Sequence, residues 1–166
     1  MAISGIDYGG TTTIGCGVAS LATSATFVAG RESDEVNNTI DKFVDASLEG
    51  FISTGTSPTN GKQIRVYVWG SHTSLASVVK DVLDGVDSAE TISNSNFLSN
   101  LLKLAEVITV SGASNAKYHF GPLSITELFG HMPKYWGLFV TQSSAVALHA
   151  TASNHEFKYT GIKYGS

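Results

Sequence analysis

Charged residues, proline and cysteine are all scarce in this chain of 166 residues, and each scarcity argues against a kind of surface or a kind of site. Charged residues make up only 14% of the sequence, and there are three prolines, so the surface differs from the Lys- and Glu-rich exterior of a typical soluble enzyme. The single cysteine, Cys16, excludes an intrachain disulfide and a thiolate metal cluster. We expect Cys16 to be a small buried residue rather than a reactive thiol.

Long apolar runs and a basic N-terminal segment are missing as well. No run approaches the ~18 apolar residues that a membrane-spanning helix needs. No basic residue precedes Arg31, so neither the start of a secretion signal nor an arginine-rich arm is present. The sequence therefore predicts no membrane contact and no export by a visible signal.

Hydroxyl residues are abundant, because Ser and Thr together supply about a fifth of the chain. A weakly charged, hydroxyl-rich exterior has few charges to keep copies apart and is common in proteins that pack against themselves. The same composition occurs in secreted binding modules, which we rank second. The length is that of one ordinary domain, 1–166.

Hydrophobic periodicity predicts the elements. In the first part we expect strands over 3–8, 12–20 and 25–29, an amphipathic helix over 33–52, a loop over 53–61 and a strand over 63–69. In the second part we expect helices over 71–85 and from about 95 onward, a strand or last helical turn over 107–110, a short helical turn over 124–130, and strands over 136–142, 145–150 and 156–164. Strands at both ends with three to four helices between them predict an α+β domain, in which the terminal strands share an antiparallel sheet.

Charge is distributed unevenly along the chain. Residues 117–166 hold four of the ten Lys and Arg but only two of the fourteen acids, together with many aromatic residues. Lys neutralises phosphate and aromatic rings stack on bases, so this third is the expected contact for a nucleic acid. The expected contact residues are Lys134, Lys158, Lys163, Tyr159 and Tyr164. Lysines on the last strand have a structural alternative, which is to discourage unwanted edge pairing.

A second basic and aromatic face is expected on the strand over 63–69. Ile64, Val66 and Val68 alternate with Arg65, Tyr67 and Trp69, and we assign the first set to the core. The second set is either such a basic-aromatic surface or a sheet face covered by a helix.

The segment 5–13, with the sequence GIDYGGTTT, resembles the first phosphate loop of the actin and sugar-kinase superfamily. That resemblance implies a nucleotide phosphate bound by Gly9, Gly10 and Thr11, with Asp7 holding a metal or its waters. We favour the alternative, a Gly-Gly hairpin turn between two strands with a structural Asp7.

No catalytic or metal-binding motif is recognised in the sequence. The five histidines, His72, His119, His131, His149 and His155, do not have the spacing of a helical His-x-x-x-His or a Cys/His ribbon. There is no Gly-x-Ser-x-Gly elbow for a nucleophilic serine. We therefore expect no cofactor, no metal and no catalytic residue.

In general character the chain resembles the coat proteins of small viruses or phages. The resemblance lies in the low charge, the abundance of Ser, Thr and Gly, and the strand-rich C-terminus ending FKYTGIKY at 157–164. It implies a non-enzymatic protein that assembles with copies of itself into a shell or filament, located in a virion or the host cytoplasm, with genomic nucleic acid as a further partner. The alternatives are a nucleotide-binding protein of the actin and sugar-kinase type, and a secreted binding module.

Overall fold

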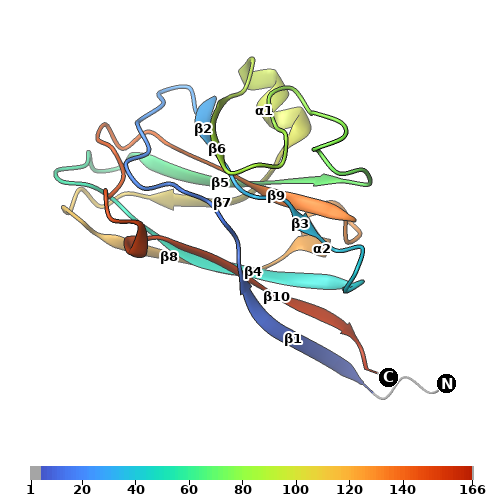
Figure 1. Cartoon of the computed structure of the whole chain (residues 1–166). Coiled ribbons are helices and arrows are strands. Elements are labelled where there is room, and N and C mark those ends of the chain that lie inside the picture. The colour runs from blue at the N-terminus through green and yellow to red at the C-terminus, as the bar shows by residue number, and fades with distance from the viewer. Residues whose placement is uncertain (1–4, 166) are drawn as a thin grey trace.

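Two antiparallel sheets packed face to face form the protein, as a computed structural model that describes residues 5–165 shows (Figure 1). Sheet A contains, in spatial order, β1 (Ile6–Thr13), β10 (Glu156–Tyr164), β4 (Asp45–Ser53) and β8 (Lys117–Ser124). Sheet B contains β6 (Ser88–Thr91), β2 (Ala29–Glu32), β9 (Tyr135–Gln142), β5 (Gln63–Ser71) and β7 (Lys103–Thr109), and β3 (Val36–Asn37) pairs with β9. The helical elements are α1 (Ser95–Leu101), α2 (Ile125–Phe129) and a 3-10 turn, η1 (Ala152–Asn154).

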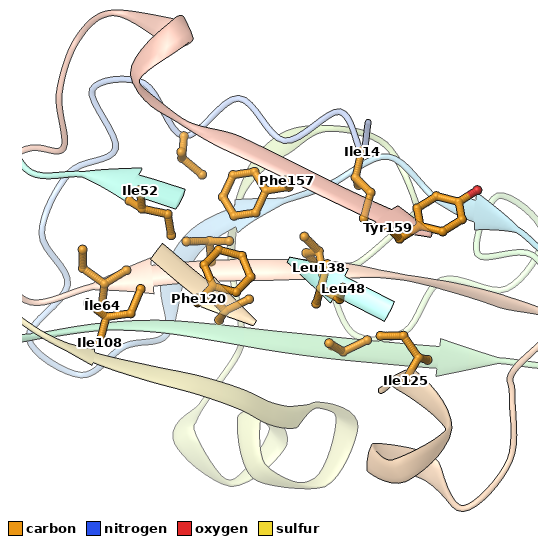
Figure 2. Close-up of a cluster of buried hydrophobic side chains, with 14 of the residues drawn as sticks. Ile14, Leu48, Ile52, Ile64, Ile108, Phe120, Ile125, Leu138, Phe157 and Tyr159 are labelled. Carbon is orange, nitrogen blue, oxygen red and sulfur yellow. The ribbon is translucent and has the colours of Figure 1, made fainter. Parts of the chain in front are cut away.

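The main core lies between the two sheets (Figure 2). Leu48 and Phe157 of sheet A meet Ile64 and Leu138 of sheet B in one cluster of buried side chains. Successive residues of a strand point to opposite faces, so β4 shows a regular alternation in which every second residue is buried. Sheet A is therefore buried on one face only.

A second apolar cluster covers the other face of sheet B. Tyr67 and Trp69 of β5 and Phe139 of β9 pack there against Leu75, Leu83, Ile92, Leu98 and Leu102. These partners come from α1, from Leu102 directly after it, and from the stretch over 75–92 before it. Sheet B is thus buried on both faces, which explains why every residue of β9 after Tyr135 is buried.

The expectation of an α+β domain with three to four helices is wrong. Strands make up 45% of the chain and helices only 9%. The two longest predicted helices, over 33–52 and 71–85, are absent from the structure. The first and last strands do pair, because β1 lies antiparallel to β10, but they belong to a two-sheet β protein.

The segment 33–52 forms β3, a turn and β4 because it carries a strand period as well as a helical one. Ala46, Leu48 and Ile52 are spaced by even numbers and all point into the core. Before β4, the side chain of Asn38 accepts a hydrogen bond from the backbone N–H of Phe43 and donates one to its carbonyl. These bonds close a turn in which Lys42 has a left-handed backbone, so a continuous helix is excluded.

The segment 71–85 is an irregular loop because carboxylates from elsewhere bind its backbone. Glu35 accepts hydrogen bonds from Ser74 and from the N–H of Leu75, and Glu32 accepts from the N–H groups of Asp84 and Gly85. Leu75 and Leu83 are buried as expected for a core element. A helix over 71–85 would place Val79 on the same face as these two leucines, but Val79 is 56% exposed.

The helix predicted from about 95 and the helical turn predicted over 124–130 are both present, as α1 and α2, although α1 ends at Leu101 and the chain continues as β7. Asn94 caps α1, and its side chain accepts from the N–H groups of Asn96 and Phe97. Ser124 caps α2 by accepting from the N–H of Glu127, and Gly130 ends the helix in the left-handed conformation. No helix in residues 5–165 has the length and apolar character that crossing a bilayer requires.

Strand predictions succeeded where alternation was clear. The predicted strands over 63–69, 136–142 and 156–164 correspond to β5, β9 and β10, and 107–110 falls largely in β7. The predicted strands over 12–20, 25–29 and 145–150 are mostly loop. In this last stretch only the isolated bridge between Leu148 and Thr54 forms.

Candidate functional site

The ribbon formed by β1 and β10 carries the largest exposed apolar feature of sheet A. Ile6 lies opposite Tyr164 and Tyr8 opposite Ile162. Directly opposed residues of an antiparallel pair point to the same face, so these four side chains share the outer face of the sheet. Ile6 and Tyr8 are each 66% exposed and Tyr164 is 61% exposed. We call Ile6, Tyr8, Ile162 and Tyr164 the ribbon patch.

The ribbon projects from the body of the molecule because β1 has little to pack against. Figure 1 shows β1 and the end of β10 reaching beyond the neighbouring strands, and seven of the eight residues of β1 are exposed. Its inner side is closed only at Gly9 and Gly161, where the ring of Phe43 lies against both glycines. A Cβ at Gly161 would clash with the ring of Phe43, so this position of β10 requires glycine.

Gly9 and Gly10 form a bulge rather than a hairpin turn. The pairing of β1 with β10 shifts register between Tyr8 and Thr11, and the strand continues to Thr13. The residues of the suggested phosphate loop, Asp7, Gly9, Gly10 and Thr11, therefore lie along one continuous strand. Asp7 faces Lys163 at 4.0 Å, and Thr11 is hydrogen-bonded to Thr160.

Among the described residues, β1 is the sheet edge with the fewest protecting features. On sheet A, the opposite edge strand β8 contains Lys117 and Pro122, and its pairing with β4 shifts register. On sheet B, β6 has only four residues and β7 carries Lys103 and Glu106. Short length, prolines, charges and bulges all discourage edge pairing. β1 has eight residues, and its protecting features are the bulge at Gly9 and Gly10 and one charged side chain, Asp7.

The C-terminal residues expected to contact a nucleic acid lie in different environments. Lys158 lies 3.6 Å from Glu49 and 3.4 Å from Glu156, and Lys163 faces Asp7. Tyr159 is 9% exposed and its ring packs edge-on against Trp136, so it is not available to stack on a base. Tyr164 belongs to the ribbon patch. Lys134 is exposed in the loop between α2 and β9.

The histidines fall into two pairs and one separate residue. His72 and His131 stack with ring centroids 5.3 Å apart. His155 contacts the carbonyl of His149 at 2.8 Å, and burial lowers the pKa of His155. His119 packs against Phe51. In residues 5–165 no three His, Cys, Asp or Glu side chains gather as a metal-ligand set.

A cluster of charged groups holds the loop over 74–87 against sheet B. Besides the bonds from Glu32 and Glu35, Arg31 pairs with Asp87, and Asp34 accepts from the N–H of Asp87. Burial raises the pKa of Glu32 to about 7, against the lowering effect of its two backbone hydrogen bonds. Burial, followed by the Asp87 carboxylate, raises the pKa of the Cys16 thiol, which is half-buried nearby.

Two neighbouring hollows lie on the outer side of sheet B, at the end remote from the loop over 74–87. The first, of about 530 Å³, is lined by Phe27, Lys62 and Ser143 among others. The second, of about 450 Å³, is lined by residues that include Arg65, Tyr67 and Lys103. Arg65 lies over the ring of Phe27 at 3.7 Å, so this stacked pair stands between the hollows. We call the two hollows together the sheet B groove.

The sequence anticipated only part of this arrangement. Arg65 and Tyr67 were recognised as a basic and aromatic face, but Phe27, Lys62 and Lys103 were not connected with them. These residues come together only through strand pairing between distant segments, and local periodicity does not predict such pairing. Trp69, expected on the same face, is fully buried under the covering segment.

Comparison with protein-family models, curated proteins and solved structures finds no match to this chain.

Proposed function

We propose that this is a non-enzymatic structural protein that assembles with copies of itself, and that its assembly is a shell or filament of the kind formed by the coat of a small virus or phage. The observation that carries the proposal is the ribbon patch. Its four apolar side chains stand on one face of a projecting ribbon whose edge strand is unpaired in the single chain.

The energetics favour a partner on this ribbon. β1 pairs on one side only, with β10, and seven of its eight residues are exposed, so burial against another surface would stabilise it. Removing exposed side chains such as Ile6 and Tyr8 from water contributes on the order of 1 kcal/mol each or more. A neighbouring strand would in addition satisfy the free backbone groups along β1.

Low charge supports the same conclusion. The formal net charge is −4 over 166 residues, so repulsion between copies is weak. Lys158 and Lys163 are also neutralised locally by acids, which reduces repulsion along the ribbon.

The proposal is tested by the mass of the purified protein in solution. We expect light scattering at micromolar concentration to show dimers or larger particles. Tyr8→Lys should shift the population toward monomer, because it places an unpaired charge in the ribbon patch. Val79→Lys is the matched control, since Val79 is similarly exposed on the irregular loop that covers sheet B. A strict monomer across pH 5 to 8 for the unaltered protein would remove the proposal.

A further inference from the structure

The sheet B groove is positively charged in an acidic protein. Two cationic residues mark it, Lys62 in the first hollow and Arg65 in the second. Lys103 borders the second hollow as well, but it is paired with Val68, whose side chain is in the core, so the Lys103 side chain leaves the sheet on the other face. No Asp or Glu is among the residues that line either hollow. The nearest acid along β7, Glu106, is paired with Val66, whose side chain points to the core on the other face of the sheet. A groove with this charge selects an anion.

Arg65 is held in one orientation. Its Nε and one terminal nitrogen donate to the side-chain oxygen of Gln63 at 3.0 and 2.8 Å, and its other terminal nitrogen contacts the hydroxyl of Tyr67 at 3.4 Å. The guanidinium is therefore fixed against Phe27, and the stack presents a ring to the first hollow and a guanidinium to the second. Aromatic rings and arginine planes are the two surfaces on which unpaired bases stack.

Phe27 is held at this position at some conformational cost. Its φ is 61°, in the left-handed region that a bulky residue rarely adopts. The backbone bond from its N–H to the carbonyl of Ser24 and the contact with Arg65 maintain it there. Phe27 also packs partly against the second apolar cluster, so its ring joins that cluster to Arg65.

We infer that the sheet B groove binds single-stranded nucleic acid. Lys62 in the first hollow and Arg65 in the second neutralise phosphates, and a base stacks on the ring of Phe27 in the Phe27–Arg65 pair. Hydroxyls along the walls, including Ser143 and Ser99, supply further donors to phosphate oxygens. This inference is independent of self-assembly, because the groove and the ribbon patch lie on different sheets.

The groove is a better candidate than the C-terminal lysines for the same partner. Lys158 lies between two acids and Lys163 faces Asp7, so a phosphate would have to displace those carboxylates. No salt bridge is recorded for Lys62 or Arg65 within residues 5–165.

The test is fluorescence anisotropy with a short labelled oligo(dT), titrated with the full-length protein over a range of salt. We expect saturable binding at low salt. The double change Lys62→Ala and Arg65→Gln should weaken it and reduce the slope of log affinity against log salt by about 1.4, since each single-strand phosphate contact contributes about 0.7. Lys62 is exposed and Arg65 is half-buried outside both apolar clusters, so the variant should fold.

The matched control is Lys158→Ala with Lys163→Ala, which should leave the affinity and the slope unchanged. An abasic oligomer of equal length tests the stacking, and we expect it to bind several-fold more weakly. Absence of binding at low salt overturns the inference, as does loss in the control pair with no loss in the groove pair. Equal binding of the abasic oligomer overturns the assignment of a base to the Phe27–Arg65 pair. Light scattering of each variant shows separately whether assembly has changed.

Discussion

Glu32 is an acidic residue in an unusual, buried environment. Its side chain is fully buried, and the backbone N–H groups of Asp84 and Gly85 are its hydrogen-bond donors. Burial outweighs these bonds and raises the pKa to about 7 from the ordinary 4.5. The carboxyl group therefore binds a proton more readily in the folded state than in the unfolded one.

This difference predicts a pH dependence of stability. A group whose folded pKa is raised contributes stability below its unfolded pKa, near 4.5, that is lost as the pH rises through about 7. We expect the free energy of unfolding, measured with urea, to decline across that window in the unaltered protein and to decline less in Glu32→Gln. The depressed pKa of His155 acts in the opposite sense, so the comparison between the two proteins isolates Glu32. If the free energy of unfolding changed with pH in the same way in the unaltered protein and in Glu32→Gln, the raised pKa of Glu32 would be contradicted.

Among the elements, α2 is stabilised by an unusually complete N-terminal cap. Ser124 accepts from the N–H of Glu127, and Asp45 of β4 accepts from the Ser124 hydroxyl at 2.8 Å and from the N–H of Thr126 at 2.9 Å. The cap thus ties the helix to the end of β4. Its loss should affect the sheet as well as the helix.

We expect Ser124→Ala to reduce the free energy of unfolding by about 1 kcal/mol, the usual effect of removing an N-cap. Thermal and urea unfolding measure this directly. Ser99→Ala serves as the control, because Ser99 bonds only to the carbonyl of Asn96 within the exposed helix α1. If the two changes lowered the free energy of unfolding equally, the cap on α2 would contribute no more than an ordinary surface hydrogen bond.

The elements also show which parts of the structure are readable from sequence. The start of α1 and both ends of α2 can be predicted because their capping residues, Asn94, Ser124 and Gly130, lie within a few positions of the helix. The strand β5 was predicted because its alternation is regular. The loop over 71–85 was misassigned because the groups that hold its backbone, Glu32 and Glu35, come from 40 to 53 residues earlier.

The candidate sites were harder to predict from the sequence, because they too depend on contacts between distant segments. The ribbon patch depends on Ile6 lying opposite Tyr164, a pairing between the two ends of the chain. Tyr159 and Tyr164 belong to the same strand and have the same chemistry, yet one is buried and the other exposed, because their strand positions differ in face and in distance from the core. Nothing local distinguishes them.

At the scale of the whole molecule, the two apolar clusters share the strands β5 and β9. Trp136 lies in the cluster between the sheets and Trp69 in the cluster above sheet B. Both clusters use alternate faces of the same strands, so neither can lose its packing while the other keeps it. The chain should therefore unfold as one cooperative unit.

Single-tryptophan variants test this. Trp69→Phe leaves fluorescence from the cluster between the sheets, and Trp136→Phe leaves it from the covering cluster. Neither indole N–H has a hydrogen-bond partner, so each change to Phe also removes an unsatisfied buried donor, and we expect both variants to fold. Each fluorescence transition in urea should coincide with the circular dichroism transition of the same variant. A fluorescence change that precedes it in either variant would mean that one cluster opens separately.

The exposed edge of β1 also limits which assemblies can form by strand-to-strand pairing between copies. If two copies joined strand to strand through β1, each would use the same edge, and the contact would obey a two-fold axis. The product would be one continuous sheet across two chains, with β8 of each copy at its far margins and no equivalent edge left to extend it. Such a contact closes on itself instead of propagating into a fibre. A larger particle would then be built from closed pairs, with growth directed by side-chain surfaces such as the ribbon patch.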